Sequence, residues 1–149
     1  MSDKLTVSVL NRSSNPLPRY ATEGSAGADL CASLDEPLVI RPGEILLIPT
    51  GLFLALPEGV DYIGSHPMAG TEFAGMTLKH GVVVANGVGT IDSDYRGEVK
   101  VILTNLSQKP YAIQPGEKIA QLVLARYEQA AFSLVDSLDE TARGEGGFG

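Results

Sequence analysis

The sequence has no tryptophan, one cysteine and two histidines among its 149 residues. A single cysteine, Cys31, permits no disulfide within the chain, which is typical of proteins that fold in the reducing cytoplasm. One cysteine and two histidines also supply too few sulfur and nitrogen ligands for a structural or catalytic zinc site. We therefore expect a cytoplasmic protein in which Cys31 packs as a small apolar side chain.

Long apolar segments and basic residues are scarce as well. No run approaches the roughly 20 apolar residues of a membrane helix, and the N-terminus lacks the basic and then apolar pattern of a signal peptide. Lysine and arginine number 11 against 18 aspartates and glutamates, for a net charge of −7. We expect no membrane association and no binding of nucleic acid polymers, whose phosphates require a basic surface. A small polyanion is compatible with this charge where arginines or a bound cation neutralise it locally.

Short apolar runs separated by Gly, Pro, Asn and Asp dominate the rest of the chain. The hydrophobic content of 44 % and the charged content of 19 % are typical of a folded globular domain. Runs rich in Val, Ile, Leu and Thr occupy residues 5–10, 38–40, 44–49, 52–56, 81–85, 98–106 and 119–127. Many short strands at this spacing predict a single all-β domain, a sandwich or barrel, with one short helical piece around residues 72–78.

The C-terminal residues differ from this β body. Residues 137–149 read SLDETARGEGGFG and contain little that can be buried, so we expect a body at residues 1–136 and a mobile arm at 137–149. A frayed terminus is one interpretation of such a tail. The other is a flap that closes over a ligand, with backbone amides and Arg143 around phosphates and Phe148 over a base.

The most informative segment is a glycine-edged bend at residues 86–99, which reads NGVGTIDSDYRGEV. Asp92 and Asp94 stand two apart, so on an extended chain both carboxylates would point to one face. There they could accept a proton from water or attract a divalent cation. Tyr95 offers a ring for stacking a sugar or base, and Asn86 offers both a donor and an acceptor. The same string is compatible with an ordinary hairpin turn, and the bend alone does not decide between the two interpretations.

Three further segments accompany the bend: SAGADL at residues 25–30, PGEKIAQL at 115–122 and RGEGGFG at 143–149. Together, from about residue 17 to residue 149, they resemble the motifs of the homotrimeric dUTPase family in that family's order. The resemblance implies an all-β fold of the distorted jelly-roll or β-barrel type with a mobile C-terminal arm. It also implies hydrolysis of dUTP to dUMP and pyrophosphate by Mg²⁺-assisted attack of water at the α-phosphorus, in a homotrimer whose three active sites lie at subunit interfaces.

The resemblance gives the residues of the bend separate roles. Asp92 is the catalytic carboxylate that activates the attacking water, Asn86 reads the edge of the uracil, and Tyr95 packs against the deoxyribose. A ring pressed on C2′ leaves no room for a 2′-hydroxyl, which separates deoxynucleotides from ribonucleotides.

The other motifs supply the metal, phosphate and base contacts. Asp29 holds the Mg²⁺ through water, which suits a cation that favours few carboxylates together with waters and phosphate oxygens. Gln121 contacts a phosphate, Arg143 binds the terminal phosphate, and Phe148 lies over the base in a site on another subunit. Lys118 stands where many members have arginine, a difference that keeps the charge and loses the fork geometry.

The second motif of the family is where this sequence departs from the pattern. Members carry Arg-Ser-Gly-Leu shortly before a Lys-His-Gly that corresponds to residues 79–81, and the arginine and serine contact the phosphates. Here residues 64–76 read GSHPMAGTEFAGM, about six residues longer than expected. Two alignments are open, placing either Phe73 and Ala74 or Met68 and Ala69 at these positions. Both lose the cation and the hydroxyl.

Residues 65–70 of this segment also resemble a histidine-bearing segment of prephenate dehydrogenases. The chain has neither a dinucleotide-binding fingerprint nor a βαβ pattern, so no dehydrogenase activity is inferred. We interpret His66 as a loop histidine without a catalytic role.

These observations lead to one main hypothesis and two alternatives. Losing one preorganised phosphate donor commonly costs about 10²–10³ in rate, so we expect a dUTP-hydrolysing enzyme with reduced turnover. The first alternative is a protein that binds deoxyuridine nucleotides without catalysis. The second, dCTP deamination by a related family, is disfavoured because Ile102 stands where that family has its catalytic glutamate, and an apolar side chain cannot move protons.

Overall fold

The structure, a computed structural model, describes residues 5–58, 60–66 and 75–147, with the backbone alone for residues 60–66 and 75. Apart from one short π-helical turn, the regular secondary structure of these residues is all strand, so the prediction of an all-β fold is confirmed. Both alignments proposed for the second motif, at residues 68–69 and 73–74, lie outside the described residues, as does Phe148.

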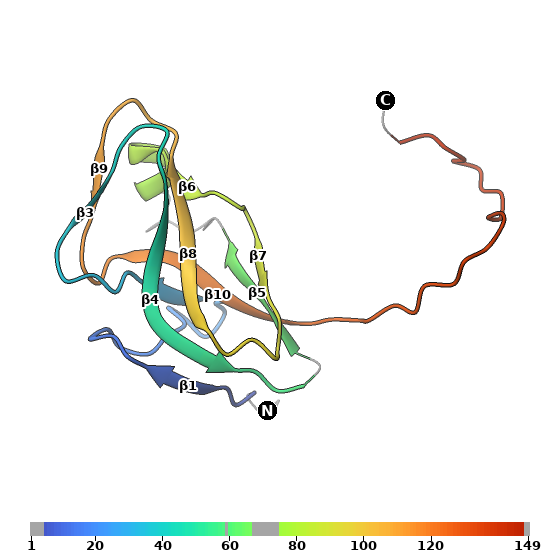
Figure 1. Cartoon of the computed structure of the whole chain (residues 1–149), viewed down its shortest axis with the longest axis horizontal. Coiled ribbons are helices and arrows are strands. Elements are labelled where there is room, and N and C mark those ends of the chain that lie inside the picture. Colours follow the sequence, from blue (N-terminus) through green and yellow to red (C-terminus); the bar gives the residue numbers. More distant parts are fainter. Residues whose placement is uncertain (1–4, 59, 67–74, 148–149) are drawn as a thin grey trace.

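Two four-stranded antiparallel sheets and one two-stranded sheet make up the body (Figure 1). In the first sheet the order is β1 (Ser8–Asn11), β4 (Ile45–Ala55), β8 (Glu98–Asn105) and β6 (Val82–Val84). In the second sheet the order is β2 (Ala28–Cys31), β10 (Lys118–Arg126), β5 (Val60–His66) and β7 (Gly89–Ile91). The small sheet pairs β3 (Leu38–Ile40) with β9 (Tyr111–Ile113), and one π-helical turn, η1 (Gly75–Lys79), precedes β6.

The hydrophobic core draws on both larger sheets. Along β8, every second side chain is buried, as expected for a strand with one face on the core. Val101 of β8 lies opposite Ile48 of β4, and both are almost fully buried. Leu30 of β2 and Leu122 of β10 contribute from the second sheet. The alternation of side chains along β2, β8 and β10 therefore decides which residues reach the core and which face away from it.

Several strand predictions match, and the differences have a physical cause. The runs predicted at residues 44–49 and 52–56 are one strand, β4, whose register against β8 shifts between Pro49 and Leu52. Strands β2, β5, β7 and β9 were not predicted, because their sequences are short or interrupted by polar residues and glycine and their pairing partners are distant in sequence. The helical piece expected around residues 72–78 is present as η1.

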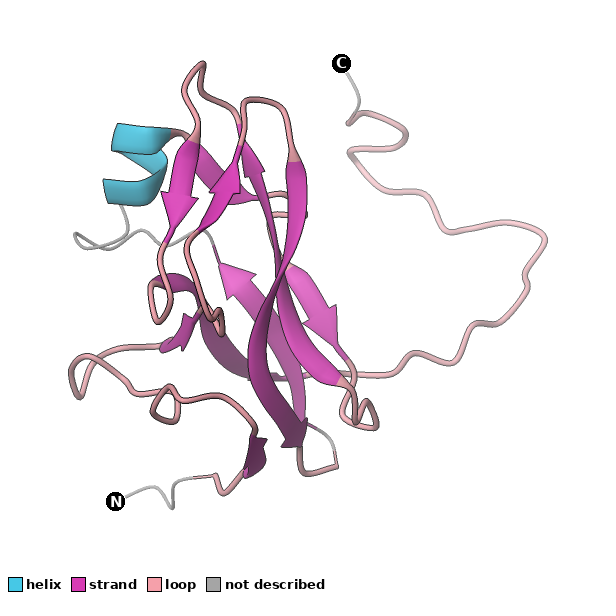
Figure 2. Cartoon of the chain, turned by 60° about the vertical axis from the view of Figure 1, so that its left-hand side comes forward, coloured by secondary structure: helices cyan, strands magenta, loops and turns pink. Residues whose placement is uncertain are grey.

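After β10 the chain leaves the sandwich and runs as an extended arm away from the two sheets (Figure 2). Phe132 and Leu134 on this segment are 98 % and 100 % exposed, so they bury nothing against their own chain. Across the part of the chain that is described, no helix is long and apolar enough to cross a membrane.

Candidate functional site

The bend at residues 86–99 connects the two larger sheets. It begins after β6 and runs into β8, which pair with each other in the first sheet, and within it β7 pairs with β5 in the second. The segment is therefore a long connection between two paired strands and not the short hairpin turn of the alternative interpretation, because it contributes a strand of its own, β7, to the other sheet.

A tight turn inside the bend changes the geometry expected for its two aspartates. The Tyr95 N–H donates to the Asp92 carbonyl at 3.1 Å, and Arg96 Nη1 donates to the Ser93 and Tyr95 carbonyls at 2.7 and 3.0 Å. The chain is thus turned rather than extended between Asp92 and Asp94. The strand-like alternation from which a shared face was expected is therefore absent, although both aspartates line a second cavity together with Arg96.

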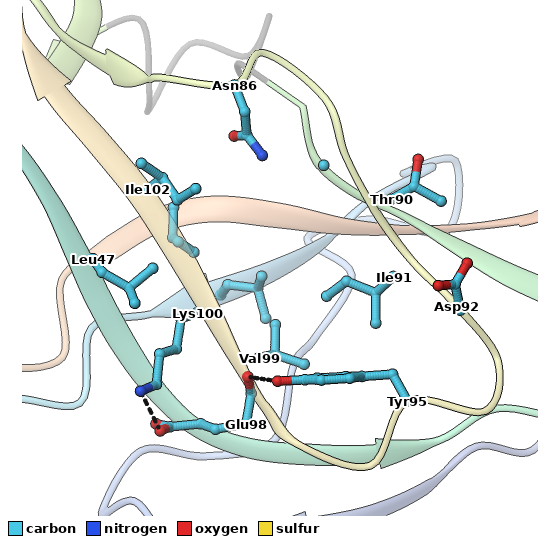
Figure 3. Close-up of a pocket in the computed structure, with 13 residues that line it drawn as sticks. Leu47, Asn86, Thr90, Ile91, Asp92, Tyr95, Glu98, Val99, Lys100 and Ile102 are labelled. Carbon is cyan, nitrogen blue, oxygen red and sulfur yellow. Dashed lines mark hydrogen bonds and ion pairs between the residues drawn. The ribbon is translucent and has the colours of Figure 1, made fainter.

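A cavity of about 340 Å³ lies beside this turn (Figure 3). It brings together the three bend residues with predicted roles, Asn86, Asp92 and Tyr95. Its other lining residues come mainly from β8 and β7, with one each from β2 and β4: Leu30, Leu47, Gly89, Thr90, Ile91, Glu98, Val99, Lys100, Val101 and Ile102. Asp94 is not among the lining residues, so only one of the two aspartates faces this space.

Backbone hydrogen bonds hold the turn that carries Asn86. The Ala85 N–H donates to the Ile102 carbonyl at 2.8 Å, and the Gly87 N–H donates to the Val84 carbonyl at 3.2 Å, which fixes the turn that carries Asn86. Asp92 and Asn86 are both exposed, so their polar atoms are available to a ligand.

Tyr95 is held from the side of β8. Its hydroxyl donates to the Glu98 carbonyl at 3.1 Å, while 47 % of the residue stays exposed (Figure 3). The Glu98 carboxylate accepts from the Gly51 N–H at 2.9 Å and lies 3.5 Å from Lys100 Nζ. Sequence reasoning assigned no role to Glu98 or Lys100, because only the packing of β4 against β8 brings Gly51 to this carboxylate.

A second polar group forms where β2 pairs with β10. Asp29 lies opposite Gln121 in the register, and Gln121 Nε2 donates to Asp29 Oδ1 at 3.1 Å. Lys118 Nζ lies 3.0 Å from Asp29 Oδ2. The approach of Gln121 depends on Gly27, because a Cβ there would lie 2.7 Å from Gln121 Oε1.

The structure keeps this second group apart from the cavity. The neighbours of Asp29 on β2, Ala28 and Leu30, are both buried, so the Asp29 side chain points to the opposite face of the strand. Neither Asp29 nor Gln121 lines the cavity, and Arg143 lies on the arm, where its Nε donates to the Gly146 carbonyl at 2.6 Å. One chain therefore joins Asn86, Asp92 and Tyr95 in one place and Asp29 with Gln121 in another.

Comparison with known proteins identifies the family of the chain. A family model described as dUTPase matches residues 13–149, which is most of the chain and includes both groups of polar residues. The chain belongs to the dUTPase family.

Individual relatives of this dUTPase-family chain agree in sequence and in fold. A deoxyuridine 5'-triphosphate nucleotidohydrolase of Finegoldia magna is 46 % identical over 145 residues, covering 97 % of each protein. The dUTPase of Staphylococcus bacteriophage 80alpha, solved with dUpNHpp, has the same fold with a TM-score of 0.82 at 23 % identity, covering 97 % of this chain and 96 % of its own. A dUTPase of phage phi11 of S. aureus, described with a structural Mg(II) ion, gives a TM-score of 0.77 at 21 % identity, covering 91 % of this chain and 99 % of its own.

The donor set of this dUTPase-family chain suits a hydrated cation better than a directly bound one. Within residues 5–58, 60–66 and 75–147, no three His, Cys, Asp or Glu side chains are grouped to hold a metal ion. Both oxygens of Asp29 already accept from Lys118 or Gln121. A carboxylate in this state fits the water shell of Mg²⁺, which readily keeps several of its waters.

The pKa of the Cys31 thiol depends on its burial and on the charge of the nearby Asp29. Burial, followed by the nearby Asp29 carboxylate, raises the pKa of the Cys31 thiol, and Lys118 lowers it. We expect Asp29→Asn to lower this pKa and Lys118→Met to raise it. At pH 8, with EDTA present, the first variant should react with a disulfide reagent roughly twofold or more faster than wild type and the second more slowly, because the thiolate is the reactive form.

The sequence provides the control for this prediction, because Cys31 is the single thiol. Reaction rates that rise in both variants would contradict a charge effect and would instead indicate greater access to the thiol.

Proposed function

We propose that this chain hydrolyses dUTP to dUMP and pyrophosphate. The observation that carries the proposal is the cavity that brings Asn86, Asp92 and Tyr95 together in a chain of the dUTPase family. The substrate and reaction are those named for its close relative, the nucleotidohydrolase of Finegoldia magna.

Asp92 is the general base of the proposed reaction. Its exposed carboxylate takes a proton from a water molecule while the water oxygen forms a bond to the α-phosphorus. The bond between the α-phosphorus and the bridging oxygen breaks, and the electron pair leaves with pyrophosphate. Most of the acceleration comes from positioning the triphosphate and stabilising the charge that develops on it.

Asn86 and Tyr95 select the nucleoside. The Asn86 amide donates to and accepts from the edge of uracil, and the Tyr95 ring lies flat against C2′ of the deoxyribose. The tether from the Tyr95 hydroxyl to the Glu98 carbonyl supports this role, since it fixes the ring before the ligand arrives.

Asp29, Gln121 and Lys118 form the phosphate side of the proposed site. Asp29 would hold Mg²⁺ through its waters, and Gln121 would contact a phosphate oxygen directly. Bound Mg²⁺ neutralises charge on the triphosphate. The ion pair of Lys118 with Asp29 at 3.0 Å supports this arrangement, because it keeps the carboxylate in one orientation.

A homotrimer completes the site in this proposal. Neither Asp29 nor Gln121 lines the cavity that holds Asn86, Asp92 and Tyr95, which supports a site to which a neighbouring copy brings the other side. The body at residues 1–136 supplies both sides, and the mobile arm at 137–149 closes a neighbour's site with Arg143 on the terminal phosphate and Phe148 on the base. The exposed Phe132 and Leu134, on the extended segment that leads into the arm, support docking of this C-terminal region on another subunit.

We propose a turnover below that of relatives with an intact second motif. Neither the arginine nor the serine of that motif is present in residues 64–76 at the aligned positions, so two phosphate donors are missing. The same observation favours the second candidate, a deoxyuridine-nucleotide-binding protein without turnover. We place either activity in the cytoplasm, consistent with the single cysteine.

One assay separates the two candidates. The protein is incubated with dUTP and Mg²⁺ and pyrophosphate is measured, with dUMP binding measured in parallel by calorimetry. Pyrophosphate release above that of an Asp92→Asn control supports the enzyme. Saturable binding with release equal to the control supports the binding protein, and absence of both contradicts the two proposals together.

A further inference from the structure

Gly97 lies against the ring of Tyr95 more closely than any side chain permits. A Cβ built on Gly97 would lie 2.8 Å from Tyr95 Cε2, and the Cζ and hydroxyl oxygen of the same ring would be closer still. The ring atoms that clash are those at the hydroxyl end. Alanine at this position therefore cannot coexist with the observed pose of Tyr95.

The conflict is one of space and not of backbone conformation. The φ of Gly97 lies outside the left-handed region, so an L-residue can adopt this backbone without strain. The ring reaches over Gly97 because its hydroxyl donates to the Glu98 carbonyl at 3.1 Å, one residue further along the chain. The ring, rather than the main chain, would move if a methyl group were added.

We propose that Gly97 is a specificity-determining residue that acts through Tyr95. Its missing side chain lets the ring fold back onto the chain and present one face to the cavity, the pose needed to exclude a 2′-hydroxyl. Gly97 touches no substrate itself and is a positioning residue. The inference rests on the proposed function, because it assumes that Tyr95 meets the sugar of a deoxyuridine nucleotide.

A double-mutant cycle on Gly97 and Tyr95 tests this inference. The variants are Gly97→Ala, Tyr95→Ala and the pair together, and Gly24→Ala is the matched control because a Cβ there meets nothing within 4 Å. The ratio of the dissociation constants of UMP and dUMP is measured by calorimetry for each protein. Binding does not require turnover, so the test holds for a slow enzyme as well.

We expect Gly97→Ala to lower the preference for dUMP over UMP by about tenfold, and Gly24→Ala to leave it unchanged. Tyr95→Ala should lose the preference to a similar extent, and adding Gly97→Ala to it should have no further effect. The inference is overturned if Gly97→Ala keeps the preference for dUMP over UMP. It is also overturned if Gly97→Ala lowers this preference equally in the wild-type protein and in Tyr95→Ala.

Three further outcomes are also decisive. If Gly97→Ala does not fold while the double variant does, the clash with the ring is supported, and failure of both to fold overturns it. A wild-type protein that binds dUMP no better than UMP contradicts the proposed function and removes this inference with it. The wild-type measurement therefore tests the function, and the variants test the role of Gly97.

Discussion

Asp92→Asn is expected to lower the rate of pyrophosphate release from dUTP by at least ~10²-fold and to leave nucleotide affinity within about threefold. Asparagine has the size of aspartate but cannot take the proton of the attacking water. The fold of the turn should survive, because its hydrogen bond from the Tyr95 N–H goes to the Asp92 main-chain carbonyl and not to the side chain. Pyrophosphate release at saturating dUTP measures the first effect, and calorimetry with dUMP measures the second.

Asp94→Asn is the matched control for this prediction. Asp94 lies two residues away on the same turn but does not line the cavity that holds Asn86, Asp92 and Tyr95. Its substitution by asparagine changes the net charge by the same amount as Asp92→Asn. We expect it to retain the wild-type rate. Equal losses in the two variants would indicate a general charge effect, and a wild-type rate in Asp92→Asn would contradict its assignment as the base.

Asn105→Ala is expected to cause the largest loss of stability among single polar substitutions, roughly 3–5 kcal/mol. Asn105 ends β8, is 0 % exposed, and donates from Nδ2 to the Ile40 carbonyl at 3.0 Å and the Lys109 carbonyl at 2.8 Å. Its Oδ1 accepts from the N–H and the hydroxyl of Ser107 at 2.9 and 2.8 Å. The substitution removes the Asn105 donor from the carbonyl of the buried Ile40, which is the costly case, and also removes the bonds that hold the loop at Ser107 and Lys109.

The free energy of unfolding from urea titrations checks this prediction, with all proteins compared at one concentration because assembly adds to apparent stability. Gln108→Ala is the control, since Gln108 is exposed on the same loop, and we expect it to change stability by less than about 0.5 kcal/mol. A loss below about 1 kcal/mol in Asn105→Ala would show that water replaces the lost bonds.

The sequence by itself determined the fold class and the family of this protein. Short apolar runs separated by Gly, Pro, Asn and Asp predict strands from local information alone, and the long strands β4, β8 and β10 lie where these runs are longest. The bend was also recognisable, because Asn86, Asp92 and Tyr95 are close in sequence and their chemistry is evident from residue type. The structure then brings these three side chains to one cavity.

The tertiary structure decided what depends on contacts between distant segments. The short strands β2, β7 and β9 form by pairing with neighbouring strands in their sheets. A segment of three or four residues is too short for the alternation of side chains to reveal a strand in the sequence. The turn between Asp92 and Asp94 overrides the two-residue alternation that suggested a shared face. Asp29 and Gln121, 92 positions apart, meet because β2 and β10 are neighbours in the sheet.

The tertiary structure also supplied the support around the site. Glu98 accepts a hydrogen bond from Gly51 across the β4–β8 pairing, and Gly97 lies against the Tyr95 ring. In the sequence both residues are ordinary members of a polar bend. Their roles depend on which atoms lie within 3 or 4 Å in the folded chain, and composition and spacing carry no information about such distances. Residue types and their order thus determined the chemistry, and long-range packing decided how that chemistry is arranged.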